Sequence, residues 1–311
     1  MTPGLLTQPL RGIIPPMVTP LLDPGTLDLM GLERLIERMI AGGVHGLFVL
    51  GSTGEGPNLS DRVRRELIHA TCERVAGRVP VLVCITDNSL EQSVSLGEWA
   101  AECGADVLVT STPYYFVVSQ GDLLREVEYL ATRLELPLYL YNMPRLTKAH
   151  FAPETVARAA QLKRVRGIKD SSGDLDYLAA VVAELSSRPE FTILTGPEEL
   201  LISSMGLGAH GGVNGGANLF PELYVRLYEA IAAGRREEAA RLQQRVLELG
   251  QFLYTVGEAE SGFLRGLKLG LELMGVCSST MTPPFAPASE ADRAALLPRL
   301  QRFEEKWRGD L

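Results

Sequence analysis

Residues 137–174, PLYLYNMPRLTKAHFAPETVARAAQLKRVRGIKDSSGD, carry the pattern that decides the fold of this 311-residue chain. The stretch begins with the short apolar run Pro137–Tyr141, continues through a helical pattern over Pro153–Gln161, and returns to a second apolar run, Val165–Lys169. Near-continuous apolar runs of this length are typical of strands that are buried on both faces of a parallel sheet. The stretch therefore predicts one strand–helix–strand unit.

The same alternation extends over most of the chain. Apolar runs predict eight strands, at Gly12–Val18, Gly46–Leu50, Val81–Ile85, Asp106–Thr110, Pro137–Tyr141, Val165–Lys169, Phe191–Thr195 and Gly211–Val213. Helical patterns occupy Leu29–Ala41, Asp61–Val75 (after Ser60), Leu90–Glu102, Gln120–Leu134, Pro153–Gln161, Asp174–Ser186, Pro197–Met205 and Pro221–Ala233. Alternating units of this number match an α/β fold of the (β/α)₈ TIM barrel type, and a doubly wound open sheet, which usually has fewer strands, is the alternative.

After Gly234 the strand patterns stop. Three helical patterns follow, at Arg235–Thr255, Glu260–Met274 and Glu290–Trp307. We therefore expect the barrel to occupy residues 10–233 and a C-terminal helical extension to occupy residues 234–311.

Composition and charge exclude several classes of protein. The chain is 46% hydrophobic and 22% charged, which is typical of a globular protein and not of a disordered one. Its net charge of −8, without a basic stripe, argues against a nucleic-acid partner. No apolar run approaches the ~20 residues that span a membrane. The N-terminal residues lack a basic segment and contain prolines, and the four cysteines are scattered, so we expect a cytoplasmic protein.

Neither a metal nor an organic cofactor is expected. No two of the four histidines are close in sequence, and the chain contains no HExxH motif or Cys/His cluster, so each histidine is interpreted as a surface or packed residue. Residues 206–211 formally match the G-x-G-x-x-G dinucleotide fingerprint. They lead into a predicted strand, whereas the fingerprint leaves a strand for a helix, so we reject the match.

Polar segments follow several predicted strands, where a barrel has its active-site mouth. The turn GSTGE (51–55) offers hydroxyls and backbone N–H groups that suit a carboxylate or phosphate, although a tight turn with a helix cap is an equal interpretation. The loop TPYYFVV (112–118) carries two tyrosines, which suit packing, an interface or chemistry. Glycines at GGVNGG (211–216) allow either a bound ligand or close packing where the barrel closes.

Tyr141 and Lys169 end two neighbouring predicted strands and, by strand alternation, both face inward. A lysine at the end of a buried strand is costly unless it has a function. Burial can lower the pKa of a lysine and so make the free amine available as a nucleophile. Such an amine forms a Schiff base with a ketone, and a nearby phenol can transfer the protons. The pair therefore predicts carbonyl chemistry.

Five segments in order, GSTGE (51–55), PYY (113–115), YNMP (141–144), GIKD (167–170) and GGVNGGAN (211–218), resemble the dihydrodipicolinate synthase/N-acetylneuraminate lyase superfamily of pyruvate-linked class I aldolases. The resemblance covers about residues 10–220. It implies that Lys169 forms the Schiff base, that Tyr141 is the proton donor and acceptor, and that Ser52 and Tyr115 complete a proton relay. It also implies that Tyr115 reaches the neighbouring subunit's site, and hence a homodimer or homotetramer.

The resemblance further implies that Thr53 and the turn amides bind the keto-acid carboxylate and that Val213 lies beside the keto acid. The synthases have an arginine where this chain has Leu146, and Arg145, one position away, would point to the other face of a strand. Leu146 instead resembles the sugar-acid lyases. The turn Gly196-Pro197-Glu198-Glu199 resembles their hydroxyl-binding turn, with Gly196 and Glu199 as substrate-binding residues, although acids at a helix N-terminus are the alternative.

These observations predict a Schiff-base aldolase or lyase that cleaves or condenses a 2-keto acid, with pyruvate as product or substrate. Its small-molecule partners would be a keto acid and an aldehyde, and a 2-keto-3-deoxy sugar acid is the favoured substrate. Three alternatives stay open. They are 4-hydroxy-tetrahydrodipicolinate synthase, which condenses pyruvate with aspartate semialdehyde, a dehydratase of the same family, and a non-catalytic barrel that binds keto acids.

Overall fold

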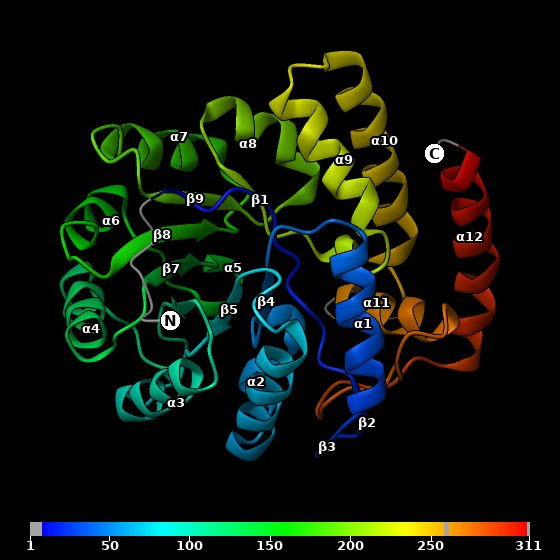
Figure 1. The fold of residues 1–311 in the computed structure, drawn as a ribbon, viewed down its shortest axis with the longest axis horizontal. Helices are drawn as coiled ribbons and strands as arrows, with labels where there is room; N and C mark the ends of the chain where they lie inside the picture. Colours follow the sequence, from blue (N-terminus) through cyan, green and yellow to red (C-terminus); the bar gives the residue numbers. More distant parts are fainter. Residues whose placement is uncertain (1–7, 258–260, 310–311) are drawn as a thin grey trace.

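The computed structural model describes residues 8–257 and 261–309. Within them, one sheet of parallel strands curls into a barrel, and helices lie around its outside (Figure 1). The strands are β1 (Gly12–Ile13), β4 (Leu47–Val49), β5 (Val81–Cys84), β6 (Val107–Ser111), β7 (Leu138–Asn142), β8 (Val165–Asp170), β9 (Thr192–Thr195) and β10 (Gly211–Gly212). They are neighbours in the order β1-β10-β9-β8-β7-β6-β5-β4. The predicted (β/α)₈ barrel is confirmed.

The barrel closes between the segment after β1 and β4. Here Pro16 forms a single parallel bridge with Phe48, whose backbone N–H donates to the Pro15 carbonyl at 3.0 Å. The Phe48 carbonyl accepts from the Met17 N–H at 2.8 Å. Because the two prolines have no N–H to donate, a regular ladder cannot continue through them. The predicted strand Gly12–Val18 is therefore reduced to two residues of strand followed by a bridge.

Helices connect the strands as the sequence predicts. They are α1 (Leu29–Ala41), α2 (Asp61–Val75), α3 (Leu90–Glu102), α4 (Gln120–Arg133), α6 (Pro153–Ala159), α7 (Leu175–Glu184), α8 (Leu201–Leu207) and α9 (Pro221–Ala232). Helix α4 begins with a capping box, in which Ser119 and Asp122 each bind the other's backbone N–H. The predicted helix Pro197–Met205 is wrong at its start, since Glu198–Leu200 form the 3₁₀ turn η3 before α8.

Two further elements lie outside the predicted pattern. A small antiparallel hairpin, β2 (Leu21–Asp23) and β3 (Thr26–Leu27), precedes α1, and a one-turn helix, α5 (Pro144–Thr147), follows β7. The hairpin turns at Asp23-Pro24-Gly25, a turn signal that is visible in the sequence. Both are too short to show a periodic apolar pattern.

The C-terminal region consists of α10 (Arg236–Leu253), α11 (Gly262–Leu273) and α12 (Glu290–Gly309), as predicted. Glu260, the predicted start of the second of these helices, lies outside the described residues. Helix α10 packs against α9, and α12 lies along one edge of the molecule against α10 and α11 (Figure 1). The division into two domains at residue 234 stays a prediction.

A packed layer inside the barrel supports the end of β7 and β8. Tyr139 is buried, and its hydroxyl bonds the Thr192 hydroxyl at 2.7 Å. It pairs in register with Gly167, where an added Cβ would lie 2.7 Å from the Tyr139 ring. The glycine thus makes room for the ring, and burial raises the pKa of Tyr139 to about 12. Tyr139 is a packing residue beneath Tyr141.

Candidate active site

Tyr141 and Lys169 lie side by side at the carboxyl ends of β7 and β8, where they are partners in the strand register. Both are buried, with 4% and 6% of their surface exposed. The Lys169 Nζ lies 4.1 Å from the centre of the Tyr141 ring and 4.9 Å from the centre of the Phe48 ring. The predicted neighbourhood of phenol and amine is confirmed, and the amine is surrounded by aromatic faces.

The turn after β4 brings Ser52 to this pair. Its Oγ lies 3.4 Å from the Tyr141 hydroxyl, and Thr53, the next residue, is buried. Residues Ser52–Gly54 form the 3₁₀ turn η1, and Gly56–Asn58 form a second, η2. An added Cβ at Gly56 would lie 2.0 Å from the Leu50 carbonyl oxygen, so a glycine is needed for the chain to fold back here. The turn is thus tightly built and reaches the active-site mouth.

Polar residues beside this pair join the two strand ends. Asn142 directly follows Tyr141, and Asp170 directly follows Lys169. The Asn142 Nδ2 donates to Asp170 Oδ1 at 2.8 Å. Asp170 also accepts from the Ser172 hydroxyl at 2.9 Å, and its burial raises the pKa of the carboxyl. Sequence reasoning missed this pair, although both residues stand in the YN and KD dipeptides that it singled out. The contact keeps β7 and β8 in register at the site.

Cys84 is a buried thiol at the same end of the barrel as Lys169. It ends β5, and its Sγ lies 3.3 Å from the Thr86 hydroxyl, which accepts the Ser111 N–H at 2.8 Å. Burial raises the pKa of the Cys84 thiol, and its hydrogen bonds with Thr86 oppose the rise.

The predicted substrate-binding residues Gly196 and Val213 stand at the ends of β9 and β10. The Val213 N–H donates to the Thr195 carbonyl at 2.8 Å, and Val213 is buried. The Gly196 carbonyl accepts from Asn214 Nδ2 at 3.2 Å. A Cβ on Gly196 would lie 2.0 Å from the Ser171 hydroxyl, so this glycine allows the chain after β9 to approach the chain after Lys169. Both residues are thus placed at the same end of the barrel as Lys169.

The two glutamates of the turn after β9, Glu198 and Glu199, lie in different surroundings. Glu198 points into the protein, where its carboxyl accepts from the Tyr224 hydroxyl at 2.8 Å, the Tyr254 hydroxyl at 2.6 Å and the Gly216 N–H at 3.1 Å. Burial raises its pKa. Glu198 is therefore not free to bind a substrate hydroxyl. Glu199 is exposed, and its binding role stays a prediction.

Residues 144–147 differ from the expectation that they continue as a strand. Strand β7 ends at Asn142, and these residues form α5. Successive residues of a helix point about 100° apart and not to opposite faces. Arg145 and Leu146 are both exposed, so the argument that Arg145 faces away from the site because of strand alternation is wrong.

Tyr115 lies apart from the other predicted catalytic residues. It stands on the loop after β6 with 76% of its surface exposed, and its ring packs edge-on against Phe116, also 76% exposed. Tyr114 and Val117 beside them are exposed as well. Among the described residues, no hydrogen bond joins Tyr115 to Ser52 or Tyr141. One chain therefore brings together Lys169, Tyr141 and Ser52, but not Tyr115.

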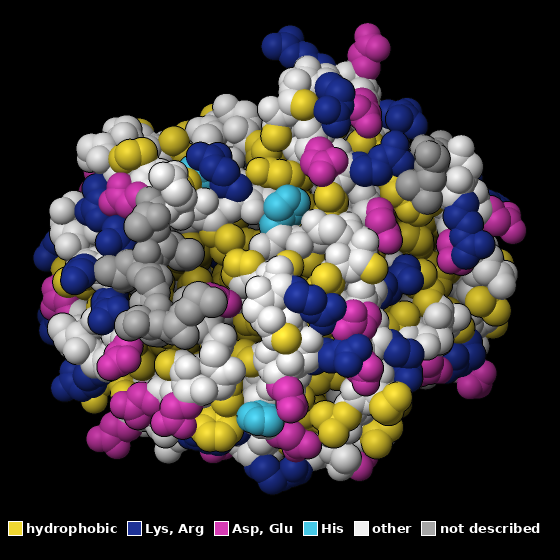
Figure 2. Space-filling view, in the orientation of Figure 1, with side chains coloured by type: hydrophobic (Ala, Val, Ile, Leu, Met, Phe, Trp, Pro, Cys, Tyr) yellow, Lys and Arg dark blue, Asp and Glu magenta, His cyan; other side chains and the backbone are white. Residues whose placement is uncertain are grey.

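Other kinds of site were searched for in residues 8–257 and 261–309. There, no cluster of three or more His, Cys, Asp or Glu side chains could hold a metal ion. No helix in this part of the chain has the length and apolar character to cross a membrane. On the face shown in Figure 2, basic and acidic side chains are interspersed.

A sequence model of the Dihydrodipicolinate synthetase family matches residues 9–302. The chain belongs to this family. It is 32% identical to the 4-hydroxy-tetrahydrodipicolinate synthase of Methanopyrus kandleri, over 94% of this chain and 96% of that protein. It is equally 32% identical to the putative 2-dehydro-3-deoxy-D-gluconate aldolase YagE of Escherichia coli, over 94% of this chain and 97% of that one.

Solved structures agree with this assignment. A structure of dihydrodipicolinate synthase from Bacteroides thetaiotaomicron is 50% identical and superposes with a TM-score of 0.92, over 95% of this chain and 99% of that one. The structure of YagE in complex with pyruvate superposes with a TM-score of 0.89, over 94% of this chain and 98% of that one. The predicted family is confirmed, and the chain is a pyruvate-dependent lyase of this family.

Proposed function

We propose that the chain is a class I aldolase in which the Lys169 amine attacks the ketone of a 2-keto acid. Tyr141 donates the proton that removes water from the carbinolamine and leaves an iminium. The tyrosinate then takes the proton of the substrate hydroxyl as the C–C bond breaks, so that an aldehyde leaves and the electrons of the bond convert the iminium to an enamine. Protonation and hydrolysis of the enamine release pyruvate and the free amine. Ser52 passes protons to and from Tyr141. The observation that carries the proposal is the register pairing of Tyr141 with Lys169, with Ser52 Oγ at 3.4 Å from the phenol.

The carboxylate of the keto acid binds at the turn that follows β4. Thr53 and the backbone N–H groups of η1 provide the donors, because the first N–H groups of a helical turn lack partners within the turn. Val213, which follows β10 at the same end of the barrel, lies beside the keto acid. The burial of Thr53 and Val213, at 6% and 3% exposure, supports these roles.

The substrate is a 2-keto-3-deoxy sugar acid, and its cleavage releases pyruvate. Leu146 supports this assignment, because an apolar side chain cannot replace a bidentate guanidinium as a carboxylate ligand. Gly196 and Glu199 contact the hydroxylated end of the substrate. The second candidate is 4-hydroxy-tetrahydrodipicolinate (dihydrodipicolinate) synthase, which is supported by the 50% identity to the dihydrodipicolinate synthase structure from Bacteroides thetaiotaomicron.

The enzyme is a homodimer or homotetramer in which the loop after β6 packs against a second chain. The exposure of Tyr114, Tyr115, Phe116 and Val117 supports this assembly, because four adjacent exposed apolar side chains are unusual on a surface that stays in water. In the assembly Tyr115 completes the proton relay of the neighbouring subunit. Analytical ultracentrifugation tests the assembly, and a monomer would contradict it.

Borohydride trapping with pyruvate tests the mechanism. We expect a reduced adduct on Lys169, located by peptide mass spectrometry, and none in the Lys169→Ala variant. Lys148→Ala, at an exposed position, is the matched control and retains the adduct. The absence of an adduct in folded, unaltered protein would refute the aldolase and favour a barrel that only binds keto acids.

A screen of substrates then separates the two candidate reactions. Release of pyruvate from a 2-keto-3-deoxy sugar acid supports the sugar-acid aldolase. Faster condensation of pyruvate with aspartate semialdehyde supports the synthase instead. Loss of water without release of pyruvate would indicate a dehydratase.

A further inference from the structure

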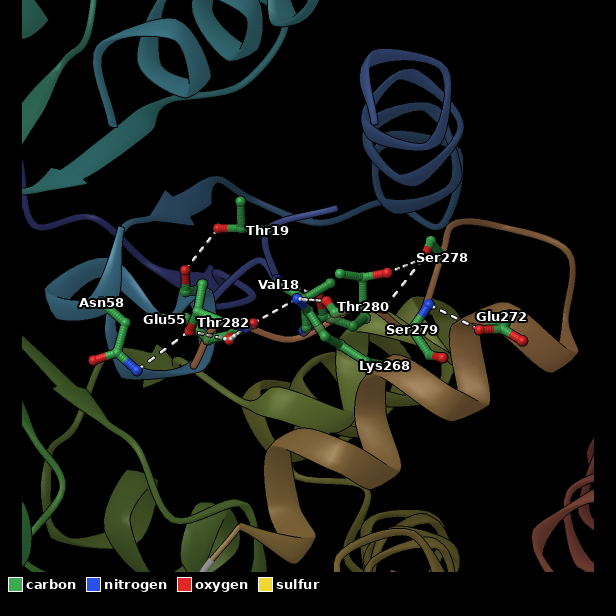
Figure 3. Close-up of polar contacts among 12 residues, drawn as sticks. Val18, Thr19, Glu55, Asn58, Lys268, Glu272, Ser278, Ser279, Thr280 and Thr282 are labelled. Atoms are coloured by element: carbon green, nitrogen blue, oxygen red, sulfur yellow. Dashed lines mark hydrogen bonds and ion pairs between the residues drawn. The ribbon is translucent and has the colours of Figure 1, made fainter. Parts of the chain in front are cut away.

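A buried ion pair joins the C-terminal helices to the turn that carries Ser52. Lys268 on α11 is fully buried, and its Nζ lies 2.5 Å from Glu55 Oε1 (Figure 3). Glu55 is also buried, with 2% of its surface exposed. The ammonium also donates to the Thr280 carbonyl at 2.5 Å. Burial lowers the pKa of Lys268, and Glu55 opposes the shift. A charge held this deeply is costly unless it is well paired, so its position needs an explanation.

The second oxygen of the same carboxylate is also held from the C-terminal region. Glu55 Oε2 accepts from the Thr282 N–H at 2.7 Å and from the Thr282 hydroxyl at 2.6 Å (Figure 3). Asn58, in the next 3₁₀ turn, donates to the same hydroxyl at 3.2 Å. The Glu55 side chain therefore forms one ion pair and accepts two hydrogen bonds, and these partners lie more than 200 positions later in the chain.

The backbone of Glu55 closes the turn that carries Ser52. Its backbone is left-handed, with φ of 55°, a conformation that is costly for a residue with a Cβ. Its N–H donates to the Ser52 carbonyl at 3.1 Å and closes η1. If the side chain is released, the backbone of Glu55 is free to relax, and Ser52 and Thr53 move with it.

We propose that Lys268 is a positioning residue for catalysis, which acts through Glu55 to hold Ser52 against Tyr141. The proposal rests on the proposed function for the roles of Ser52 and Tyr141. It makes α11 and the segment 280–282 part of the active-site scaffold. Thr19 supports the turn from the other side, since its hydroxyl donates to the Gly54 carbonyl at 2.6 Å.

The test compares Lys268→Met with Arg265→Met. Arg265 stands on the same helix and is equally enclosed, at 3% exposure. It donates to partners outside the turn, namely Val256 O, Ser261 Oγ and Ala286 O. The double variant Glu55→Gln/Lys268→Met removes both charges and leaves an amide oxygen for Thr282. It is the variant to use if Lys268→Met does not fold, because it leaves no unpaired buried charge.

Turnover per adduct-forming site is the deciding measurement, with sites counted by borohydride trapping of pyruvate. A purely structural role lowers the number of competent sites and leaves the turnover of each unchanged. Mispositioning lowers the turnover of sites that still form the adduct. We expect a fall of at least about tenfold per site in the Lys268 variants, because small displacements at a proton-transfer site are costly. Arg265→Met should stay within about twofold of the unaltered protein.

Hydrogen–deuterium exchange of the peptide that contains residues 50–58 provides a readout independent of activity. We expect faster exchange in the Lys268 variants and not in Arg265→Met. Equal turnover per site, or equal exchange, in the Lys268 and Arg265 variants would overturn the proposal. If the unaltered protein forms no adduct, the proposed function fails, while the exchange comparison still decides whether Lys268 holds the turn.

Discussion

Two histidines hold strands of the barrel in the same way. The backbone N–H of Ile13 donates to His45 Nδ1 at 3.2 Å, and that of Ile193 donates to His210 Nδ1 at 3.0 Å. In return, the backbone N–H of each histidine donates to the carbonyl of the same isoleucine, at 2.8 and 2.7 Å. Each Nδ1 must therefore stay unprotonated. Burial lowers the pKa of both, and for His210, where Arg11 adds to the effect, it falls to about 4.

The magnitude for His210 follows from this shift. A fall from 6.5 to about 4 corresponds to at most about 3 kcal/mol of folding free energy at low pH, because solvent screens part of the effect at this half-buried ring. Because the folded pKa lies below the unfolded one, the unfolded chain binds more protons between these two values. The stability is fully present above about pH 6.5 and is lost as the pH falls toward 4. By pH 5 the loss is at most about 2 kcal/mol.

The variant His210→Asn tests this reasoning, since its side-chain oxygen can accept the Ile193 N–H but does not titrate. We expect the free energy of unfolding in urea at pH 7.5 to be nearly unchanged, and the unaltered protein to lose about 1–2 kcal/mol more than the variant at pH 5. His150→Asn, at an exposed position, is the control and should follow the unaltered protein. The same loss at pH 5 in His210→Asn as in the unaltered protein would refute the assignment.

Three further substitutions, one of them a control, test packing and hydrogen bonding in the barrel. Gly56→Ala places a Cβ 2.0 Å from the Leu50 carbonyl and should cost about 1–3 kcal/mol or more, read as a lower Tm. Gly206→Ala, in α8 with open space around it, should be neutral or stabilising by up to ~1 kcal/mol, and equal effects of the two would contradict the geometry. Tyr254→Phe removes a 2.6 Å donor from Glu198 and should cost about 1–3 kcal/mol in urea unfolding. Unchanged stability would mean that this bond contributes nothing.

The sequence by itself determined the barrel and the central pair of the site. Strand and helix periods are local properties, so the apolar runs could be counted and their order read without tertiary information. Parallel strands end at one edge of the sheet, and side chains alternate along each strand. These two rules were sufficient to bring Tyr141 and Lys169 together, as the register of β7 and β8 confirms.

Only the tertiary structure decided which polar side chains are exposed and which are buried within the scaffold. Glu198 and Glu199 are adjacent in sequence, yet one is buried against Tyr224 and Tyr254 and the other is exposed. The partner of Glu55 stands on a helix that the sequence pattern separates from the barrel. No periodicity encodes such contacts, because they depend on how elements more than 200 residues apart pack together. Burial and pairing, and therefore charge state and function, follow from that packing.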